Sequence, residues 1–311
     1  MSKVFTACLI LFASLQFAQA EDNITYIVGL SYQDKNLNFS QRYSGAASNE
    51  ADFSVHMPML NASLTAVYKK VFVKIKAERS MADISANTTE TDRSVLFESN
   101  LITLEGSEID VERTDNSFTV GYVPWRSLSV FTGYLEGETK LTPDAFCANP
   151  FSEVPCSRTN RAFQQFVLGD EGIVDNQPSY TQVYSESGYY LGLSYNFKIG
   201  ELGSLSTSFA MAQMDGEYRD NANDPTNGFA DPVSGAPTFV AFHYKGDTTG
   251  TSLSLTWTGS LGDSSAYFLN VRRQSYSMDG QDVTGLVNFE GVTLKTDEEI
   301  LGVSLGVRLY Y

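Results

Sequence analysis

The residues best suited to chemistry are charged side chains that recur at every second position within apolar stretches. In VFVKIKAE, residues 71–78, Lys74, Lys76 and Glu78 alternate with apolar residues. Because successive side chains of an extended strand point to opposite faces, these charges would share one face of a strand whose other face is apolar. The same reasoning places three further cations on such a polar face: Lys198, Arg272 and Arg308. A concentration of positive charge of this kind attracts anions.

These cations allow two interpretations. In the first, they line the constriction of a narrow conduit that favours small anionic solutes. In the second, they pair with acidic residues that fold between the strands, and they serve as part of a plug. Glu78 and Glu136 are the acidic residues that we predict on the same polar face. For these side chains we favour the second interpretation, the plug. Between a narrow solute pathway and a surface-interaction barrel, however, the polar and basic face is the most specific feature of the sequence and favours the porin-like role.

Hydrolytic chemistry usually needs a histidine as the base. The chain has two histidines, His56 and His243, and Asp247 is the nearest candidate partner of His243. Neither SVHMP nor AFHYK places an acid or a serine beside the histidine in a persuasive arrangement. The acidic residues between 80 and 115 also lack the spacing of a calcium-binding loop. We therefore predict no enzyme, no metal site and no cofactor.

The N-terminus and the cysteines indicate export. Residues 1–20 combine Lys3, an apolar stretch and the sequence Ala-Gln-Ala, which is typical of a cleaved secretory signal peptide. Residues 21–311 are predicted to form one domain. That domain contains Cys147 and Cys156, which we predict to form a disulfide in an oxidising compartment, with two unpaired thiols as the alternative.

The elements that must position these side chains are strands. Residues 21–311 contain no apolar stretch of the length that a membrane helix needs, whereas short alternating runs are frequent. The runs predict about ten strands of about 9 to 11 residues, or about twelve if VYSES and TFVAFHYK add strands. Short links near Lys69, Pro124, Glu201 and Gly262 alternate with long connections over residues 33–58, 80–115, 139–186, 215–249 and 276–298. This alternation is typical of an all-β, up-and-down antiparallel transmembrane β-barrel with short periplasmic turns and long extracellular loops.

The aromatic residues are sorted by height along these strands. If the first strand runs outward, Tyr32, Tyr134 and Tyr189 fall toward the outer end of the lipid-facing surface. Seven others fall toward the periplasmic end: Tyr26, Tyr68, Tyr122, Tyr195, Trp257, Tyr267 and Tyr311. Membrane barrels carry such belts where lipid meets water. A soluble secreted β-sandwich is the alternative fold, and it has no reason to sort its aromatic residues in this way.

The last residues of the chain carry a resemblance to a known family. Tyr311 is a terminal aromatic residue, preceded by Leu309 at two positions, Gly306 at five and Ser304 at seven. This spacing resembles the C-terminal assembly signal of Gram-negative outer-membrane β-barrel proteins, in which an aromatic residue is common at the position of Leu309. The resemblance implies insertion into the bacterial outer membrane by the barrel-assembly machinery, which is then a partner. An even number of strands would place both termini on the periplasmic side.

The expected function follows from the strand number. Ten strands enclose a narrow lumen, so we expect a narrow porin-like channel for small solutes. The first alternative is a non-conducting barrel in adhesion, surface binding or envelope structure. The second is a hydrolase, because omptin-like proteases resemble this chain in size and in the predicted number of strands.

Lipid is the partner that the outer face predicts. Arg79 and Arg273 each follow an apolar run at its outer end, where they could contact outer-membrane lipid and lipopolysaccharide phosphates. The acidic residues between 80 and 115 are predicted to be solvated surface charge. The formal net charge of −16 argues against nucleic acid as a partner. The sequence predicts no oligomeric state.

Overall fold

The computed structural model describes residues 24–44, 47–81, 84–94, 102–143, 182–220, 243–283 and 293–311. The predicted signal peptide and the predicted Cys147–Cys156 disulfide lie outside these residues. The strands are β1 (Ile24–Ser44), β2 (Ala47–Tyr68), β3 (Val71–Ser80), β4 (Ile84–Ser94), β5 (Ile102–Trp125), β6 (Leu128–Pro143), β7 (Gln182–Lys198), β8 (Ser204–Asp220), β9 (His243–Ser260), β10 (Ser265–Asp282) and β11 (Thr293–Tyr310). One 3₁₀ turn, Gly200–Leu202, joins β7 to β8. Among the described residues no helix has the length and apolar character needed to cross a membrane.

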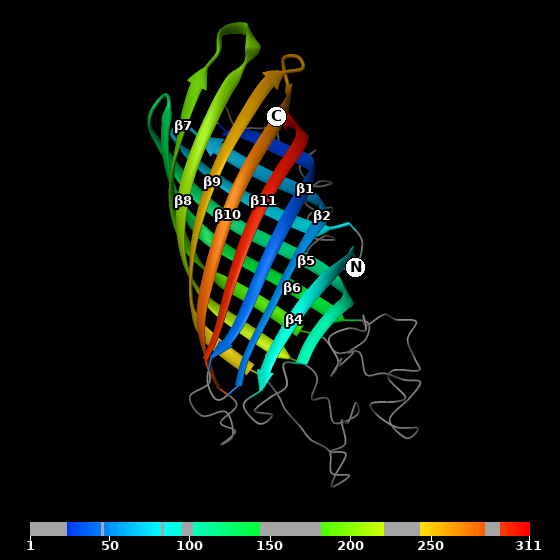
Figure 1. Cartoon of the computed structure of the whole chain (residues 1–311). Coiled ribbons are helices and arrows are strands. Elements are labelled where there is room, and N and C mark those ends of the chain that lie inside the picture. Colours follow the sequence, from blue (N-terminus) through cyan, green and yellow to red (C-terminus); the bar gives the residue numbers. More distant parts are fainter. Residues whose placement is uncertain are drawn as a thin grey trace.

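The strands close into a barrel. Apart from β3 and β4, which do not pair with each other, each strand pairs antiparallel with its neighbours in sequence, and β1 pairs with β11 from Ile27–Tyr310 to Ser44–Thr293. Strands β3 and β4 are two parts of one interrupted strand, because both lie between β2 and β5. The barrel therefore has ten strand positions, which confirms the predicted fold and strand number. In Figure 1 the first strand (blue) lies beside the last (red).

We name the two ends of the barrel by their connections. The turn end carries the short links from β2 to β3, β5 to β6, β7 to β8 and β9 to β10, together with Ile24 and Tyr311. The opposite end is the distal end. The turn end is at the top of Figure 1.

The strands are much longer than predicted. Uninterrupted strands range from 16 residues in β6 to 24 in β5. Most residues predicted as long loops (33–58, 80–115, 139–186, 215–249 and 276–298) that the structure describes are therefore strand, including VYSES in β7 and HYK in β9. The prediction of loops was wrong because the alternation of apolar and polar residues continues toward the distal end. There the apolar residues point into the barrel and the polar residues point outward.

Near the turn end the outer face of the barrel is apolar. On β11 the outward residues run from Leu301 through Leu305, 61% exposed, to Tyr311. Ten residue steps cover about 33 Å along a strand, which a tilt of about 40° reduces to a height of about 25 Å. Tyr32, Tyr134 and Tyr189 are exposed on the outer surface at the distal edge of this apolar belt. Such a belt matches the apolar band of a membrane barrel.

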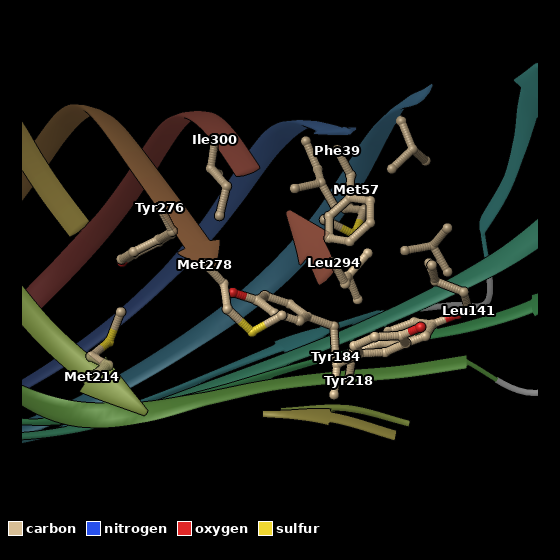
Figure 2. Packing of buried hydrophobic residues seen from close by; sticks show 14 of the residues in the cluster. Phe39, Met57, Leu141, Tyr184, Met214, Tyr218, Tyr276, Met278, Leu294 and Ile300 are labelled. Atoms are coloured by element: carbon tan, nitrogen blue, oxygen red, sulfur yellow. The ribbon is translucent and has the colours of Figure 1, made fainter. Parts of the chain in front are cut away.

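Beyond the belt the polarity of the wall is inverted. Polar residues such as Asp34, Glu138 and Asp297 face outward, and apolar side chains fill the interior. Figure 2 shows Phe39, Tyr184, Tyr218 and other members of this buried cluster pointing toward one another from different strands. The rings of Phe39 and Tyr184 meet edge to face with 5.7 Å between centroids. The distal half thus has the apolar interior and the polar exterior of a water-soluble barrel.

Candidate functional site

The lumen holds a cavity near the turn end and a layer of charged residues on the distal side of this cavity. The cavity has a volume of about 440 Å³. Five of the six predicted lumen residues line it: Lys74, Lys76, Glu78, Arg272 and Arg308. Strand β3 supplies the first three, because its inner face is the polar one, and the arginines come from β10 and β11.

Two predicted inner-face residues lie elsewhere. Lys198 is exposed at the turn end of β7 and does not line the cavity. The pairing of β7 with β6 ends at Tyr195, so Lys198 lies on the part of β7 that extends beyond β6. Glu136 is exposed on the outer face of β6, on the same side of the strand as Tyr134. The alternation in this part of β6 is less clean in sequence, which explains the error.

The charged layer consists of ion pairs that reach across the lumen. Lys35 Nζ on β1 lies 2.7 Å from Glu78 Oε2 on β3 and 2.6 Å from Asp115 Oδ2 on β5. Arg113 on β5 contacts three carboxylates: Asp115 at 2.9 Å, Glu186 on β7 at 3.1 Å and Glu298 on β11 at 2.9 Å. We call Lys35, Glu78, Arg113, Asp115, Glu186 and Glu298 the cross-lumen cluster. Wherever two members of the cluster come from different strands and contact each other, those strands are not neighbours in the barrel wall. The cluster therefore connects separate parts of the wall.

The cluster is buried. Lys35 has no exposed surface, and Arg113, Glu186 and Glu298 are at most 2% exposed. Ion pairs in such surroundings lose their hydration, so they persist only where several hydrogen bonds replace it. Arg113 Nη1 also donates to Thr139 Oγ1 at 2.7 Å, and Asn61 Nδ2 donates to Glu78 Oε1 at 2.9 Å.

The cluster has more carboxylates than cations, even when Lys76, which contacts Glu78 Oε1, is included. Glu186 lies beyond the apolar belt, since its sequence neighbours Ser185 and Ser187 are polar. Burial, and next the Glu298 carboxylate, raise the pKa of Glu186 to about 8, against the opposing effect of Arg113. A neutral Glu186 balances the charge of the layer at neutral pH. Within the described residues its Oε2 has no hydrogen-bond partner.

The sequence analysis did not predict most residues of the cross-lumen cluster to lie inside the barrel. Lys35, Glu186 and Glu298 fell in predicted loops, and Arg113 and Asp115 were assigned to the solvated acidic segment 80–115. That assignment is wrong for these two residues, which are buried inside the barrel. The available signal was spacing: Arg113 and Asp115 continue the alternation of the inward Val111.

The histidines lie on the outer surface, away from the cavity. His243 Nε2 on β9 lies 2.5 Å from Glu217 Oε1 on β8, and this carboxylate rather than Asp247 is its partner. His56 is exposed on β2. Among the described side chains no group of histidine, cysteine, aspartate and glutamate could hold a metal ion.

The remaining predicted residues lie on the outer wall and at the closing strand. Arg79 and Arg273 are exposed at the distal edge of the apolar belt, and Arg273 pairs with Glu299 at 2.9 Å. Of the C-terminal residues, Ser304 and Gly306 face the interior, and Leu309 and Tyr311 face outward. Backbone hydrogen bonds between Tyr26 and Tyr311 complete the closure.

A closed antiparallel barrel of ten strand positions, with an apolar outer belt and a polar lumen behind it, has the fold of a Gram-negative outer-membrane β-barrel protein. No family model and no curated protein matches the sequence. Solved structures do match, among them the outer membrane protease OmpT from Escherichia coli, with a TM-score of 0.59 and 10% identity over 93% of this chain and 97% of that chain.

Two other matching structures have lower TM-scores. The outer membrane protein OprG from Pseudomonas aeruginosa has a TM-score of 0.36 and 10% identity, covering 94% of this chain and 98% of its own. The toluene transporter TodX from P. putida has a TM-score of 0.32 and 10% identity, covering 96% and 92%. At this level of identity the similarity to OmpT shows the fold alone. A fold shared by proteins of different activities does not select one.

Proposed function

We propose that this protein is an outer-membrane barrel closed to solute flow, and that its function is carried by the surface of its distal half in adhesion, surface binding or envelope structure. The observation that carries this proposal is the cross-lumen cluster, in which Arg113 joins Glu298 and Glu186 across the barrel. A hydrated solute cannot pass between partners that lie within hydrogen-bonding distance of one another.

The apolar cluster beyond these ion pairs is a second barrier. Phe39, Met57, Tyr184, Tyr218 and Leu294 are at most 2% exposed. An ion that entered this layer would lose its hydration, and the few hydroxyl groups there, such as those of Tyr184 and Tyr218, would replace only part of it, which is costly. Closure therefore rests on two barriers of different chemistry, and disruption of one would leave the other in place.

The distal half suits a role at the cell surface. Its outer wall is charged, with Asp297, Glu299, Lys245 and Arg219 among its exposed or half-buried residues. We propose that the turn end faces the periplasm, in keeping with the C-terminal assembly signal, and that the distal half stands outside the membrane. We also retain Arg79 and Arg273, at the edge of the belt, as proposed contacts for lipopolysaccharide phosphates.

A narrow anion channel is the second candidate function. It is favoured by the four cations that line the cavity, Lys74, Lys76, Arg272 and Arg308. This function requires that both barriers move aside. Hydrolysis is not proposed, because the described His243–Glu217 pair lies on the outer wall and no serine is among its described partners.

Planar-bilayer recording of the full mature protein tests the proposal. We expect no steady conductance from protein whose folded state is verified by its heat-modifiable migration, while a general porin reconstituted in the same way conducts. An anion-selective current that falls in the Arg272→Gln/Arg308→Gln variant would contradict closure and establish the second candidate instead.

A further inference from the structure

The cavity near the turn end carries positive charge that the protein leaves largely uncompensated. Lys76 contacts Glu78, but among the described residues no carboxylate is within ion-pair distance of Lys74, Arg272 or Arg308. Arg272 Nε donates to Ser252 Oγ at 3.0 Å. Arg308 lies 4.5 Å from the centroid of the Phe268 ring. Both arginines are thus held against the wall by uncharged neighbours.

These cations are close enough to repel one another. Lys74 is repelled by Lys76, Arg308 and Arg272, and among the described residues the carboxylate that acts against this repulsion is that of Glu78. Their strands form part of the wall that the apolar belt surrounds, where the low dielectric of lipid strengthens the repulsion. A low-dielectric wall lined by one sign of charge also concentrates counter-ions in the space that it encloses. An anion in the cavity would relieve the repulsion.

Much of the remaining lining consists of hydroxyl groups. Ser129, Ser194, Ser208 and Ser254 on β6 to β9 line the cavity, and the Ser208 and Ser254 hydroxyls are 2.6 Å apart. Hydroxyl groups both donate and accept hydrogen bonds, so this wall suits a molecule with hydroxyl groups of its own. Tyr190 and Phe131 add aromatic surface against which the apolar face of a sugar ring can pack.

The cavity is open at one end. Its inner end is formed by Glu78 and Asp115 of the cross-lumen cluster, which are 4% and 9% exposed. Lys74, Arg272 and Arg308 are partly exposed, so solvent reaches them from the turn end. The volume of about 440 Å³ lies within the range of about 300 to 1,000 Å³ that is usual for small-molecule sites.

We infer that this cavity is a binding site for a small organic anion that carries at least two negative charges and several hydroxyl groups, with sugar phosphates as the simplest class, and that the ligand enters from the turn end. The inference goes beyond the proposed function. If the barrel is closed as proposed, the cavity is a blind pocket that holds such an anion, whereas a channel would pass it on.

Isothermal titration calorimetry of the full mature protein, in a non-ionic detergent at low salt, tests the site with glucose 6-phosphate. We expect one molecule bound per chain, weaker binding of inorganic phosphate, no detectable binding of glucose, and an affinity that falls as salt is added. Arg272→Gln and Arg308→Gln should each weaken binding about tenfold, the scale expected for one lost charge-assisted contact.

Arg126→Gln is the matched control, because Arg126 is exposed in the turn between β5 and β6 at the turn end and does not line the cavity. Lys198→Gln is a second control that removes a cation at the turn end outside the cavity. Both should bind as the parent protein does. Absence of binding by folded parent protein, or equal losses in Arg272→Gln and Arg126→Gln, would overturn the inference.

Calorimetry and bilayer recording can refute the anion site and the closure of the barrel independently of each other. A conducting barrel that binds glucose 6-phosphate would refute closure, and with it the blind pocket, while the anion site itself would stand. A silent barrel that does not bind it would refute the site and leave closure in place.

Discussion

Arg113 is almost fully buried, and its guanidinium group contacts carboxylates on β5, β7 and β11. Arginine suits this position because its planar group offers five N–H donors in a fixed arrangement. Lysine could not bridge three acids with the same geometry. The residue therefore connects parts of the wall that the hydrogen-bond ladder leaves unconnected.

Replacing Arg113 should be among the most damaging single changes. Arg113→Met would leave Glu186, Glu298 and Asp115 buried without their main cation, and we expect a loss of about 3 to 5 kcal/mol in the free energy of unfolding. Urea-induced unfolding measures the effect. Arg219→Met, which breaks a pair on the outer surface, should cost less than about 1 kcal/mol. Equal costs for the two variants would contradict the assigned role.

The same layer should make stability depend on pH. The pKa of Glu186 is raised to about 8 by burial and by Glu298, with Arg113 opposing and Asp115 adding to the rise. A raised pKa means that the folded state binds this proton more tightly than the unfolded state. The stabilisation is therefore complete below the unfolded value near 4.5 and is lost as pH rises through about 8.

Unfolding in urea between pH 6 and pH 9 tests this dependence. The free energy of unfolding should fall with rising pH, by at most about 1.4 kcal/mol per pH unit for one group. Glu186→Gln should flatten the slope, because the amide cannot ionise. An unchanged slope in that variant would assign the effect to another group.

At the scale of elements, the inner wall pairs aromatic residues with glycines. Five aromatic side chains lie directly across from a glycine on the adjacent strand: Phe72 and Gly121, Phe131 and Gly192, Tyr190 and Gly133, Phe268 and Gly306, and Tyr276 and Gly250. A β-carbon at Gly121 would collide with the Phe72 ring. The glycines thus let the rings lie flat against the wall and preserve space in a narrow lumen.

This arrangement predicts a coupling between Gly121 and Phe72. Gly121→Ala should lower the free energy of unfolding by about 1 to 3 kcal/mol, because the ring must leave its position. In a Phe72→Ala background the same change should cost clearly less. Urea unfolding of the four proteins in this cycle measures the difference, and an identical cost in both backgrounds would show that the ring is not the cause.

The sequence predicted the strands well only near the turn end. There the outward residues are apolar, as on β11 from Leu301 to Tyr311, and the cavity cations fall on the opposite face. Near the distal end, Leu37 and Phe39 alternate with polar residues in the same way but face inward. The alternation shows which residues share a face of a strand, but it does not show which face points into the barrel. Contacts such as Arg113–Glu298, between residues 185 positions apart, leave no signal in the local sequence.

At the scale of the whole molecule, the two halves are stabilised in different surroundings. The half near the turn end exposes an apolar belt, and the distal half buries its apolar residues in its own core. Only the first half needs lipid or detergent to cover its surface. One continuous set of strands joins them, so both halves share the closure between β1 and β11.

Closure makes the C-terminus a sensitive position. Tyr311→Ala removes the terminal aromatic residue of the assembly signal, and we expect a several-fold smaller fraction of heat-modifiable protein in the outer membrane. Tyr310→Ala is the matched control, because it removes an aromatic residue whose side chain is on the other face of the strand. Equal losses from both substitutions would argue against recognition of the terminal residue.

The length of the strands also determines what this protein can touch. The eight residues of β11 from Thr293 to Ile300 lie beyond the belt and rise by about 20 Å at the usual tilt. With the proposed orientation, the strand ends stand beyond the lipid headgroups, which add only about 5 to 8 Å on each side of the hydrocarbon core. A large molecule that cannot approach the lipid itself would still meet the rim of the barrel.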